Sequence, residues 1–310
     1  MRALLFFFLF AGPAAAFPVE RCINLSNFLE VQRGEGWSYP ADLAHIDRIA
    51  DVGFDTLRLP VNAASWWRDG RIDPRFEVLM LATVERARAA GLFVIVDLHH
   101  FTDFIDDPSA HGDRFVAIWV ALAEALKGQD GVAFELLNEA YGDATIDRVF
   151  PHYMRALASI RSRHPEAWVI FGGGDWNHLN RLADLPASDD PRIVHTFHYY
   201  SPFEFTHQKA EWIDPVPPPS NWNRASGKDA VEADMARAAA HPMPVFLGEF
   251  GAIREAPRAD RLAWIETVRR AAEAEGIPWC HWGFGARFRI FDPETETFDE
   301  ELLEALLKNN

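Results

Sequence analysis

The sequence is poor in cysteine and in positive charge. Two cysteines, Cys22 and Cys280, stand among 310 residues, which is too few for a disulfide-stapled scaffold, so the fold must rest on a hydrophobic core. Lys and Arg number 30 against 46 Asp and Glu, and the formal net charge is -16. Because no run of basic residues offsets this charge, we expect neither nucleic acid nor an anionic membrane as a partner. A neutral ligand fits better than a polyanion.

Long apolar runs are also lacking, except at the N-terminus. Residues 1–16 start with a basic residue, continue with an apolar stretch to Phe10 and end with Pro13 and three alanines. This is the layout of a signal peptide cleaved after Ala16, whereas a membrane-spanning helix needs about 20 apolar residues. We therefore expect a secreted or periplasmic protein, whose mature chain, residues 17–310, forms one catalytic domain and is a monomer.

Apolar, β-branched segments recur along the chain, with amphipathic stretches between them. This alternation is typical of buried parallel strands joined by helices. The expected strands are Cys22–Leu25, Thr56–Pro60, Phe93–Leu98, Ala133–Leu137, Trp168–Phe171, Ile193–His198, Val245–Gly248 and Trp279–Trp282. The expected helices are Tyr39–Val52, Pro74–Ala90, Arg114–Leu126, Thr145–Ser162, Ala230–Ala240, Arg258–Gly276 and Asp299–Lys308.

Eight such units favour an α/β fold with a single (β/α)8 TIM barrel, although a doubly wound open sheet would have the same periodicity. The proline-rich segment Ser201–Gly227 is predicted to be a long loop at the carboxyl end of a strand, where barrels place their active sites. Cys22 and Cys280 belong to the first and last strands, which a closed barrel makes neighbours. A disulfide and two buried free thiols are then both compatible with the sequence.

Two of the expected strands end in a carboxylic acid. Glu139 follows the fourth strand after Asn138, and Glu249 ends the seventh, so both reach the same rim of a barrel. One such acid can protonate the leaving oxygen of a glycosidic bond while the other attacks the anomeric carbon. Arg58, at the end of the second strand, is the natural counter-charge, or alternatively a structural ion pair. Glu135, within the fourth strand, is predicted to be structural.

Histidines and an aspartate at strand ends form a second candidate site. The residues concerned are Asp97, His99, His100, His195 and His198. Adjacent histidines are common metal ligands, but the two acids stand at other strand ends, and a metal site needs convergent ligands. We therefore predict no metal and no cofactor, and we interpret the histidines as hydrogen-bonding, orienting residues.

These positions resemble glycoside hydrolase family 5, the cellulase family, whose two catalytic acids end the fourth and seventh strands. Glu139 and Glu249 match those acids, and the family's other site residues match Arg58, His99, Asn138, His198, Tyr200 and Trp282. The opening segment Ile23–Glu30 is similar to the family's first-strand motif, and Phe203–Trp212 resembles a loop of its bacterial endoglucanases. Ala140 and Ser26 depart from the family pattern, which usually has Pro and Gly there.

The resemblance implies a retaining endoglucanase that cleaves β-1,4-glucosidic bonds in cellulose-type or mixed-linkage β-glucans. Its partner would be a polysaccharide or oligosaccharide. A β-mannanase or a β-1,3-glucanase would use the same mechanism, and a noncatalytic carbohydrate-binding barrel is a more distant alternative.

The resemblance also implies a role for each matched residue. Glu249 would be the nucleophile and Glu139 the acid/base. Asn138 would bind the sugar 2-hydroxyl, while Tyr200 and Arg58 would stabilise Glu249. His99 and His198 would position the sugar, and Trp282 would form the floor of the subsite that holds it. Further residues expected to bind substrate are His100, Trp37, Trp176, Trp212 and Phe28.

Overall fold

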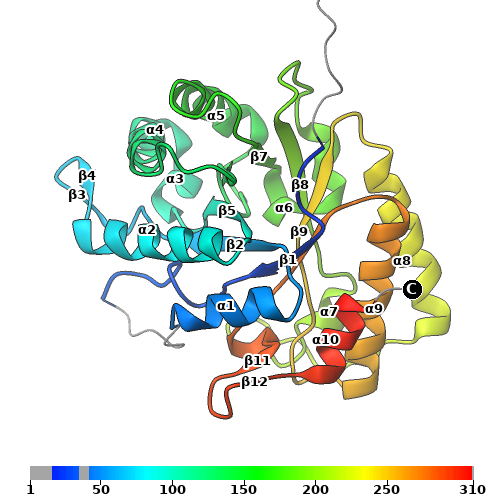
Figure 1. Cartoon of the computed structure of the whole chain (residues 1–310). Coiled ribbons are helices and arrows are strands. Elements are labelled where there is room, and N and C mark those ends of the chain that lie inside the picture. The colour runs from blue at the N-terminus through cyan, green and yellow to red at the C-terminus, as the bar shows by residue number, and fades with distance from the viewer. Residues whose placement is uncertain (1–15, 35–41, 309–310) are drawn as a thin grey trace, which may run out of the picture.

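The structure is a computed structural model that describes residues 16–34 and 42–308. Eight parallel strands form a closed barrel in the order β1-β10-β9-β8-β7-β6-β5-β2 (Figure 1). The strands are β1 (Arg21–Asn24), β2 (Thr56–Val61), β5 (Phe93–Leu98), β6 (Val132–Glu135), β7 (Val169–Gly172), β8 (Ile193–Tyr199), β9 (Val245–Phe250) and β10 (Trp279–His281). This confirms the predicted (β/α)8 barrel. The open-sheet alternative is wrong, because β1 pairs with both β2 and β10.

Helices cover the outside of the barrel (Figure 1). The longer ones are α1 (Ala44–Asp51), α2 (Pro74–Ala89), α4 (Pro108–Ala125), α5 (Ile146–Arg161), α8 (Arg224–Ala239), α9 (Arg258–Ala274) and α10 (Glu300–Leu307). They bury an apolar stripe against the strands, as Val149, Tyr153 and Ile160 do in α5. Neighbouring helices also pack on each other, α4 on α5 and α8 on α9. No described helix is long and apolar enough to cross a bilayer.

Two helices begin earlier than their apolar stripes predict. Helix α4 begins at Pro108 rather than Arg114, because Asp107 accepts hydrogen bonds from two backbone N–H groups of the first turn. Helix α8 begins at Arg224 rather than Ala230, because the side chain of Asn223 caps it in the same way. A cap and a first-turn proline can start a helix before its buried face begins.

The connections at the carboxyl ends of the strands contain short elements that periodicity does not predict. Between β7 and β8 lie α6 (Gly174–Asn177) and the 3-10 helix η1 (Leu179–Asp184). After β8, the predicted long loop contains α7 (Phe203–Thr206). Small hairpins follow β2 and β10, and their strands are β3 (Trp67–Arg68), β4 (Arg71–Ile72), β11 (Phe291–Asp292) and β12 (Thr297–Phe298). The remaining short helices are α3 (Thr102–Asp106) and η2 (Ala286–Phe288).

A disulfide joins the first and last strands of the barrel. Cys22 and Cys280 are register partners in β1 and β10, and their sulfurs are bonded. The bond lies in an apolar layer with Ile95, Ile170 and Phe246. The alternative of two free thiols is therefore wrong. The predicted signal peptide, residues 1–16, lies almost entirely outside the described residues.

We expect the double variant Cys22→Ala/Cys280→Ala to fold but to be less stable. The bond joins residues 258 positions apart in the sequence. Removing such a cross-link lowers the free energy of unfolding by about 2 to 5 kcal/mol, because the unfolded chain gains conformational entropy. Thermal unfolding in non-reducing buffer should show a melting temperature about 5 to 10 °C below wild type.

Dithiothreitol during unfolding supplies the control for this prediction. It should lower the melting temperature of the wild type towards that of the double variant and leave the variant unchanged. Equal melting temperatures of wild type and variant without reductant would contradict a stabilising role for the bond.

Candidate active site

Polar and aromatic side chains from six strand ends meet at one mouth of the barrel. Arg58 lies on β2, and Glu249 lies on β9. His99 follows β5, Asn138 and Glu139 follow β6, His198 and Tyr200 stand at the end of β8, and Trp282 follows β10. Parallel strands present their carboxyl ends on one face of a barrel. Contacts link all eight predicted residues through this mouth: His198 joins Glu139 to Glu249, and Asp97 joins the His99–Trp282 pair to Arg58.

Arg58 lies at the centre of these contacts and is completely buried. Its guanidinium makes a bidentate pair with Glu135, at 2.7 and 2.9 Å. It also donates to Glu249 Oε1 at 2.8 Å and to Asn138 Oδ1 at 2.9 Å. Arg58 therefore makes both contacts considered from the sequence, because one edge of its guanidinium forms a buried ion pair with Glu135 and another donates to the predicted catalytic acid Glu249. The structural role of Glu135 stays a prediction.

Two further partners of Arg58 were not singled out for this role in the sequence. Asn24, the last residue of β1, accepts from Arg58 at 2.7 Å. Asp97 lies 3.1 Å from the guanidinium and 2.6 Å from His99 Nδ1, and so joins Arg58 to His99. The available signal was position: each is a polar residue at or near the carboxyl end of an apolar strand, like the residues that were identified.

Glu249 is held by donors on both carboxylate oxygens. Arg58 donates to Oε1, and the Tyr200 hydroxyl donates to Oε2 at 2.9 Å. His198 Nδ1 stands 3.6 Å away. Charged and neutral donors of this kind stabilise the ionised form of a carboxyl group.

Glu139 has a different environment. Among the described residues, its side chain makes a hydrogen bond with His198 Nδ1, at 2.7 Å from Oε1, and it is 28% exposed against 5% for Glu249. A carboxylate oxygen of Glu139 and one of Glu249 lie within 4.8 Å of each other. The second oxygen of Glu139 is therefore available to a bound molecule in the mouth of the barrel.

The two acids are strongly coupled. Burial raises the pKa of Glu139 and that of Glu249 to about 7 each, while the charge of Arg58 lowers both. Carboxyl groups this close titrate as a coupled pair. The two donors to Glu249 favour the negative charge on that residue and the proton on Glu139.

The family comparison agrees with this geometry. The family model described as Cellulase (glycosyl hydrolase family 5) matches residues 17–287 of the chain. The chain belongs to glycosyl hydrolase family 5.

Named relatives of this family are similar over most of the chain. Endoglucanase H of Acetivibrio thermocellus is 31% identical over 91% of the chain, which spans only 32% of that longer protein. A solved hyperthermophilic endo-β-1,4-glucanase in complex with substrate superimposes with a TM-score of 0.90 at 31% identity, covering 94% of this chain and 97% of that one. Thermotoga maritima Cel5A in complex with mannotriose gives 0.88 at 28% identity, covering 93% and 97%.

The two histidines of the family 5 site are neutral at pH 7. Burial lowers the pKa of His198 to about 4 and that of His99 well below its usual value. The His99 ring stacks on Trp282, with centroids 5.3 Å apart and planes 3° from parallel. These two rings line the mouth beside Asp97.

The histidine-rich metal site considered from the sequence does not assemble. His195 contacts His241 at 2.8 Å, whereas His99 pairs with Asp97. Among the described residues, the group with metal-ligand spacing is instead Glu139, His198 and Glu249. This group contains the two predicted catalytic acids, Glu139 and Glu249, whose closeness accounts for the ligand-like spacing.

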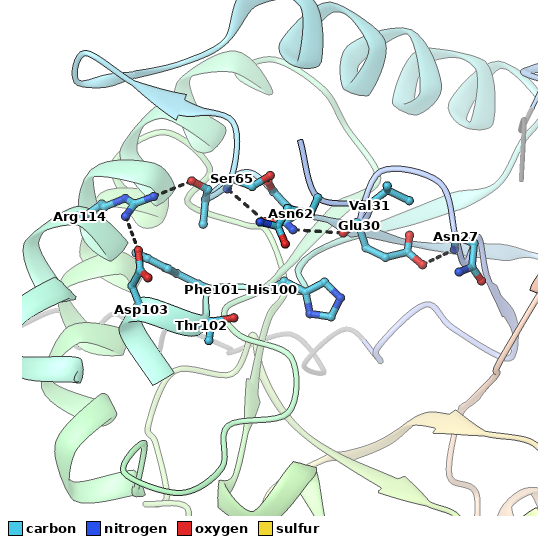
Figure 2. A pocket seen from close by; sticks show the side chains of 12 residues that line it. Asn27, Glu30, Val31, Asn62, Ser65, His100, Phe101, Thr102, Asp103 and Arg114 are labelled. Carbon is cyan, nitrogen blue, oxygen red and sulfur yellow. Dashed lines mark hydrogen bonds and ion pairs between the residues drawn. The ribbon is translucent and has the colours of Figure 1, made fainter. Parts of the chain in front are cut away.

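A polar cavity of about 630 Å³ opens next to this site (Figure 2). It is lined by the loops after β1, β2 and β5, including Asn27, Glu30, Asn62 and His100, and by Arg114 of α4. The His100 ring packs against that of His99, with centroids 4.7 Å apart, so one wall of the cavity borders the site. This position suits the predicted sugar-binding role of His100.

The other predicted substrate-binding residues have contrasting environments. Trp176 is 53% exposed and stacks on Tyr141, and Trp212 is 57% exposed beneath the Arg287 guanidinium. Both offer a ring face to solvent. Phe28 is 5% exposed within the apolar core, which disfavours stacking on a sugar. Trp37 lies outside the described residues.

Glu30 explains the burial of Phe28. Its carboxylate accepts hydrogen bonds from the backbone N–H groups of Asn27 and Phe28 and so closes the turn after β1. Burial raises the pKa of Glu30 to about 7. The first-strand motif contains Glu30, but the sequence does not show that it turns back on its own loop.

We expect Tyr200→Phe to shift the acidic limb of the kcat/KM profile to higher pH. The Tyr200 hydroxyl lowers the pKa of Glu249, so removing it raises that pKa, and Glu249 becomes protonated earlier as pH falls. At neutral pH, kcat/KM should fall about tenfold. The profile on a soluble β-glucan measures both effects.

Tyr199→Phe is the matched control, because the Tyr199 hydroxyl donates to Asp234 on α8 at 3.0 Å and not to the site. It should leave the acidic limb in place. An unchanged limb in Tyr200→Phe, or an equal shift in both variants, would contradict the assignment.

Proposed function

We propose that this protein is a retaining endo-β-glucanase that cleaves β-1,4-glucosidic bonds in cellulose-type or mixed-linkage β-glucans. The observation that carries the mechanism is the approach of the Glu139 and Glu249 oxygens to within 4.8 Å. Retaining glycosidases hold their acids about 5 to 5.5 Å apart, whereas inverting ones leave about 6.5 to 9.5 Å for a water. The endoglucanase names of its relatives support the glucan substrate.

In the first step, Glu249 attacks the anomeric carbon while Glu139 donates its proton to the glycosidic oxygen. The bond from carbon to the leaving oxygen breaks, and a covalent glycosyl-enzyme forms on Glu249. Arg58 and Tyr200 hold the attacking carboxylate ionised and oriented. Asn138, itself fixed by Arg58, is positioned to bind the 2-hydroxyl.

In the second step, Glu139 acts as a base. It is now a carboxylate, accepts a proton from water and directs the hydroxyl to the anomeric carbon, so that Glu249 leaves with its electron pair. Two inversions at one carbon give net retention. The raised pKa of Glu139, about 7, suits a group that must give and regain a proton near neutral pH.

We propose that the protein acts outside the cytoplasm, in a secreted or periplasmic location. The apolar run in residues 1–16 has the layout of a signal peptide. The Cys22–Cys280 disulfide supports the same conclusion, because structural disulfides persist mainly in oxidising compartments.

A β-mannan is the second candidate substrate. Thermotoga maritima Cel5A, 28% identical to this chain, has been solved with mannotriose. The same two acids would cleave both glycans, and the loops around the cavity of Figure 2 would decide between them.

We expect wild-type protein to hydrolyse carboxymethylcellulose and barley β-glucan, with the first product retaining the β configuration in a time-resolved NMR spectrum. Glu249→Ala should lose at least about 10³-fold in kcat/KM, because it lacks the nucleophile. Glu266→Ala, which removes a surface carboxylate on α9, should be unaffected. Inversion, or full activity without Glu249, would overturn the mechanism, while activity on mannan alone would keep the mechanism and replace the substrate.

Chelation tests the alternative of a metal-dependent hydrolase. Both acids and His198 have roles in proton and glycosyl transfer, so we expect incubation with excess EDTA followed by dialysis to leave kcat/KM unchanged. A loss restored by adding a divalent cation would favour the grouping of Glu139, His198 and Glu249 as ligands.

A further inference from the structure

Three consecutive residues after β7 have a left-handed backbone. Asp175, Trp176 and Asn177 have φ values of 56, 56 and 53°. Such conformations are unfavourable for non-glycine residues and persist only where the surroundings impose them, often at functional sites. The contacts of this turn should therefore show what holds the backbone in this conformation.

The turn sends two neighbouring side chains in opposite directions. The exposed Trp176 ring stacks on Tyr141, and the Trp176 N–H donates to the carbonyl of Ala140 at 3.0 Å. Asn177 points inward and is 1% exposed. Its amide rests on Gly172, where a Cβ would stand 2.3 Å from Asn177 Oδ1. A glycine at that position therefore makes room for the buried amide.

The buried amide reaches the acid/base through a histidine. Asn177 Nδ2 lies 3.4 Å from His198 Nε2, and His198 Nδ1 lies 2.7 Å from Glu139 Oε1. The three side chains form a row from the β7 turn to the predicted proton donor. Asn177 belongs to none of the family 5 positions matched from the sequence.

We propose that Asn177 is a positioning residue that fixes His198 with its proton on Nδ1, so that the acidic proton of Glu139 occupies Oε2. The proposal rests on the proposed function, in which Glu139 is the acid. A neutral imidazole has one donor and one acceptor nitrogen. An amide N–H can only donate, so Nε2 must accept and Nδ1–H must donate to Glu139 Oε1.

The orientation of the amide follows from which atom is left without a partner. Asn177 Oδ1 has no hydrogen-bond partner among the described residues. Turning the amide over would bring Oδ1 to His198 and leave the NH₂ group unpaired instead. A buried unpaired N–H is rarer in proteins than an under-satisfied carbonyl, so the orientation with Nδ2 towards His198 is favoured.

The tautomer decides where the proton of Glu139 can go. With Nδ1–H donating to Oε1, the acid proton stays on Oε2, where that O–H bond breaks as the leaving oxygen gains the proton. The resulting carboxylate keeps the electron pair and is stabilised by Nδ1–H. In the opposite tautomer, the Nδ1 lone pair would accept the Glu139 proton and compete with the leaving group.

Other charged groups around His198 do not replace this control. Glu249 Oε2 stands 3.6 Å from Nδ1, and Arg58 and Glu135 act on the ring over longer range. Burial lowers the pKa of His198 to about 4, so the ring is neutral near pH 7. A neutral ring carries its one proton on either Nδ1 or Nε2, and the contacts of the ring decide which.

The first test is spectroscopic and needs no substrate. Long-range ¹H–¹⁵N correlation spectra at pH 7, with the His198 signals assigned by their loss in His198→Gln, report which ring nitrogen carries the proton. We expect Nδ1–H and a bare Nε2 in the wild type. Asn177→Asp puts a carboxylate acceptor in the same place, and Nε2 should become protonated. A wild-type proton on Nε2, or an unchanged tautomer in Asn177→Asp, would overturn the proposal.

The second test compares leaving groups on one glycone. Phenyl β-cellobioside needs acid assistance, whereas 2,4-dinitrophenyl β-cellobioside does not. Asn177→Ala and Asn177→Asp should lose about tenfold in kcat/KM on the phenyl substrate, a part of what general acid catalysis contributes. They should stay within about twofold of wild type on the dinitrophenyl substrate. Equal losses on both would indicate a structural role and overturn the proposal.

Asn180→Asp is the matched control. It makes the same charge change three residues away, where Asn180 Oδ1 accepts from Arg237 at 2.8 Å, on the side of α8. It should alter neither the tautomer of His198 nor the ratio of kcat/KM on the phenyl substrate to that on the dinitrophenyl substrate. If the wild type hydrolyses neither glycoside, the proposed function fails, and the NMR result alone still decides the tautomer.

Discussion

The buried guanidinium of Arg58 is the interaction on which this barrel mouth depends. It lies within 3.1 Å of carboxylate oxygens from three other strands, those of Asp97, Glu135 and Glu249. Burying that many acids without a cation would cost several kcal/mol for each ion. The planar fork of arginine can meet several acceptors at once, so one side chain offsets part of this negative charge and ties β2, β5, β6 and β9 together.

This arrangement also separates the two catalytic acids chemically. Both are buried enough for the pKa of each to rise to about 7. The difference between them comes from hydrogen bonds, because Glu249 receives Arg58 and Tyr200 while Glu139 receives His198. Two carboxyl groups on one rim can thus perform different tasks in a retaining mechanism.

Two loop turns shape the surroundings of this centre. The left-handed turn at 175–177 turns one aromatic ring to solvent and one amide to His198. The turn after β1, closed by Glu30, buries Phe28 and shapes the cavity of Figure 2. Family 5 membership defines the reaction class.

Much of the fold was predictable because its signals are local. The alternation of strand and helix follows from residue spacing, and all eight strands appeared where the apolar segments indicated. Helix starts were less predictable, since the side chains of Asp107 and Asn223 begin α4 and α8 ahead of the buried stripe. Short polar elements such as α6 are too short to show a periodic pattern of apolar residues.

The sequence by itself determined the barrel, the two acids and the residues that flank them, because position at a strand's carboxyl end implies the shared rim. Only the tertiary structure decided how they pair. The Cys22–Cys280 bond depends on strand register, the partners of Arg58 on the closure of the barrel, and the reach of Asn177 to His198 on a backbone conformation that residue type does not indicate. Each depends on distances between segments far apart in the chain, which local residue patterns do not contain.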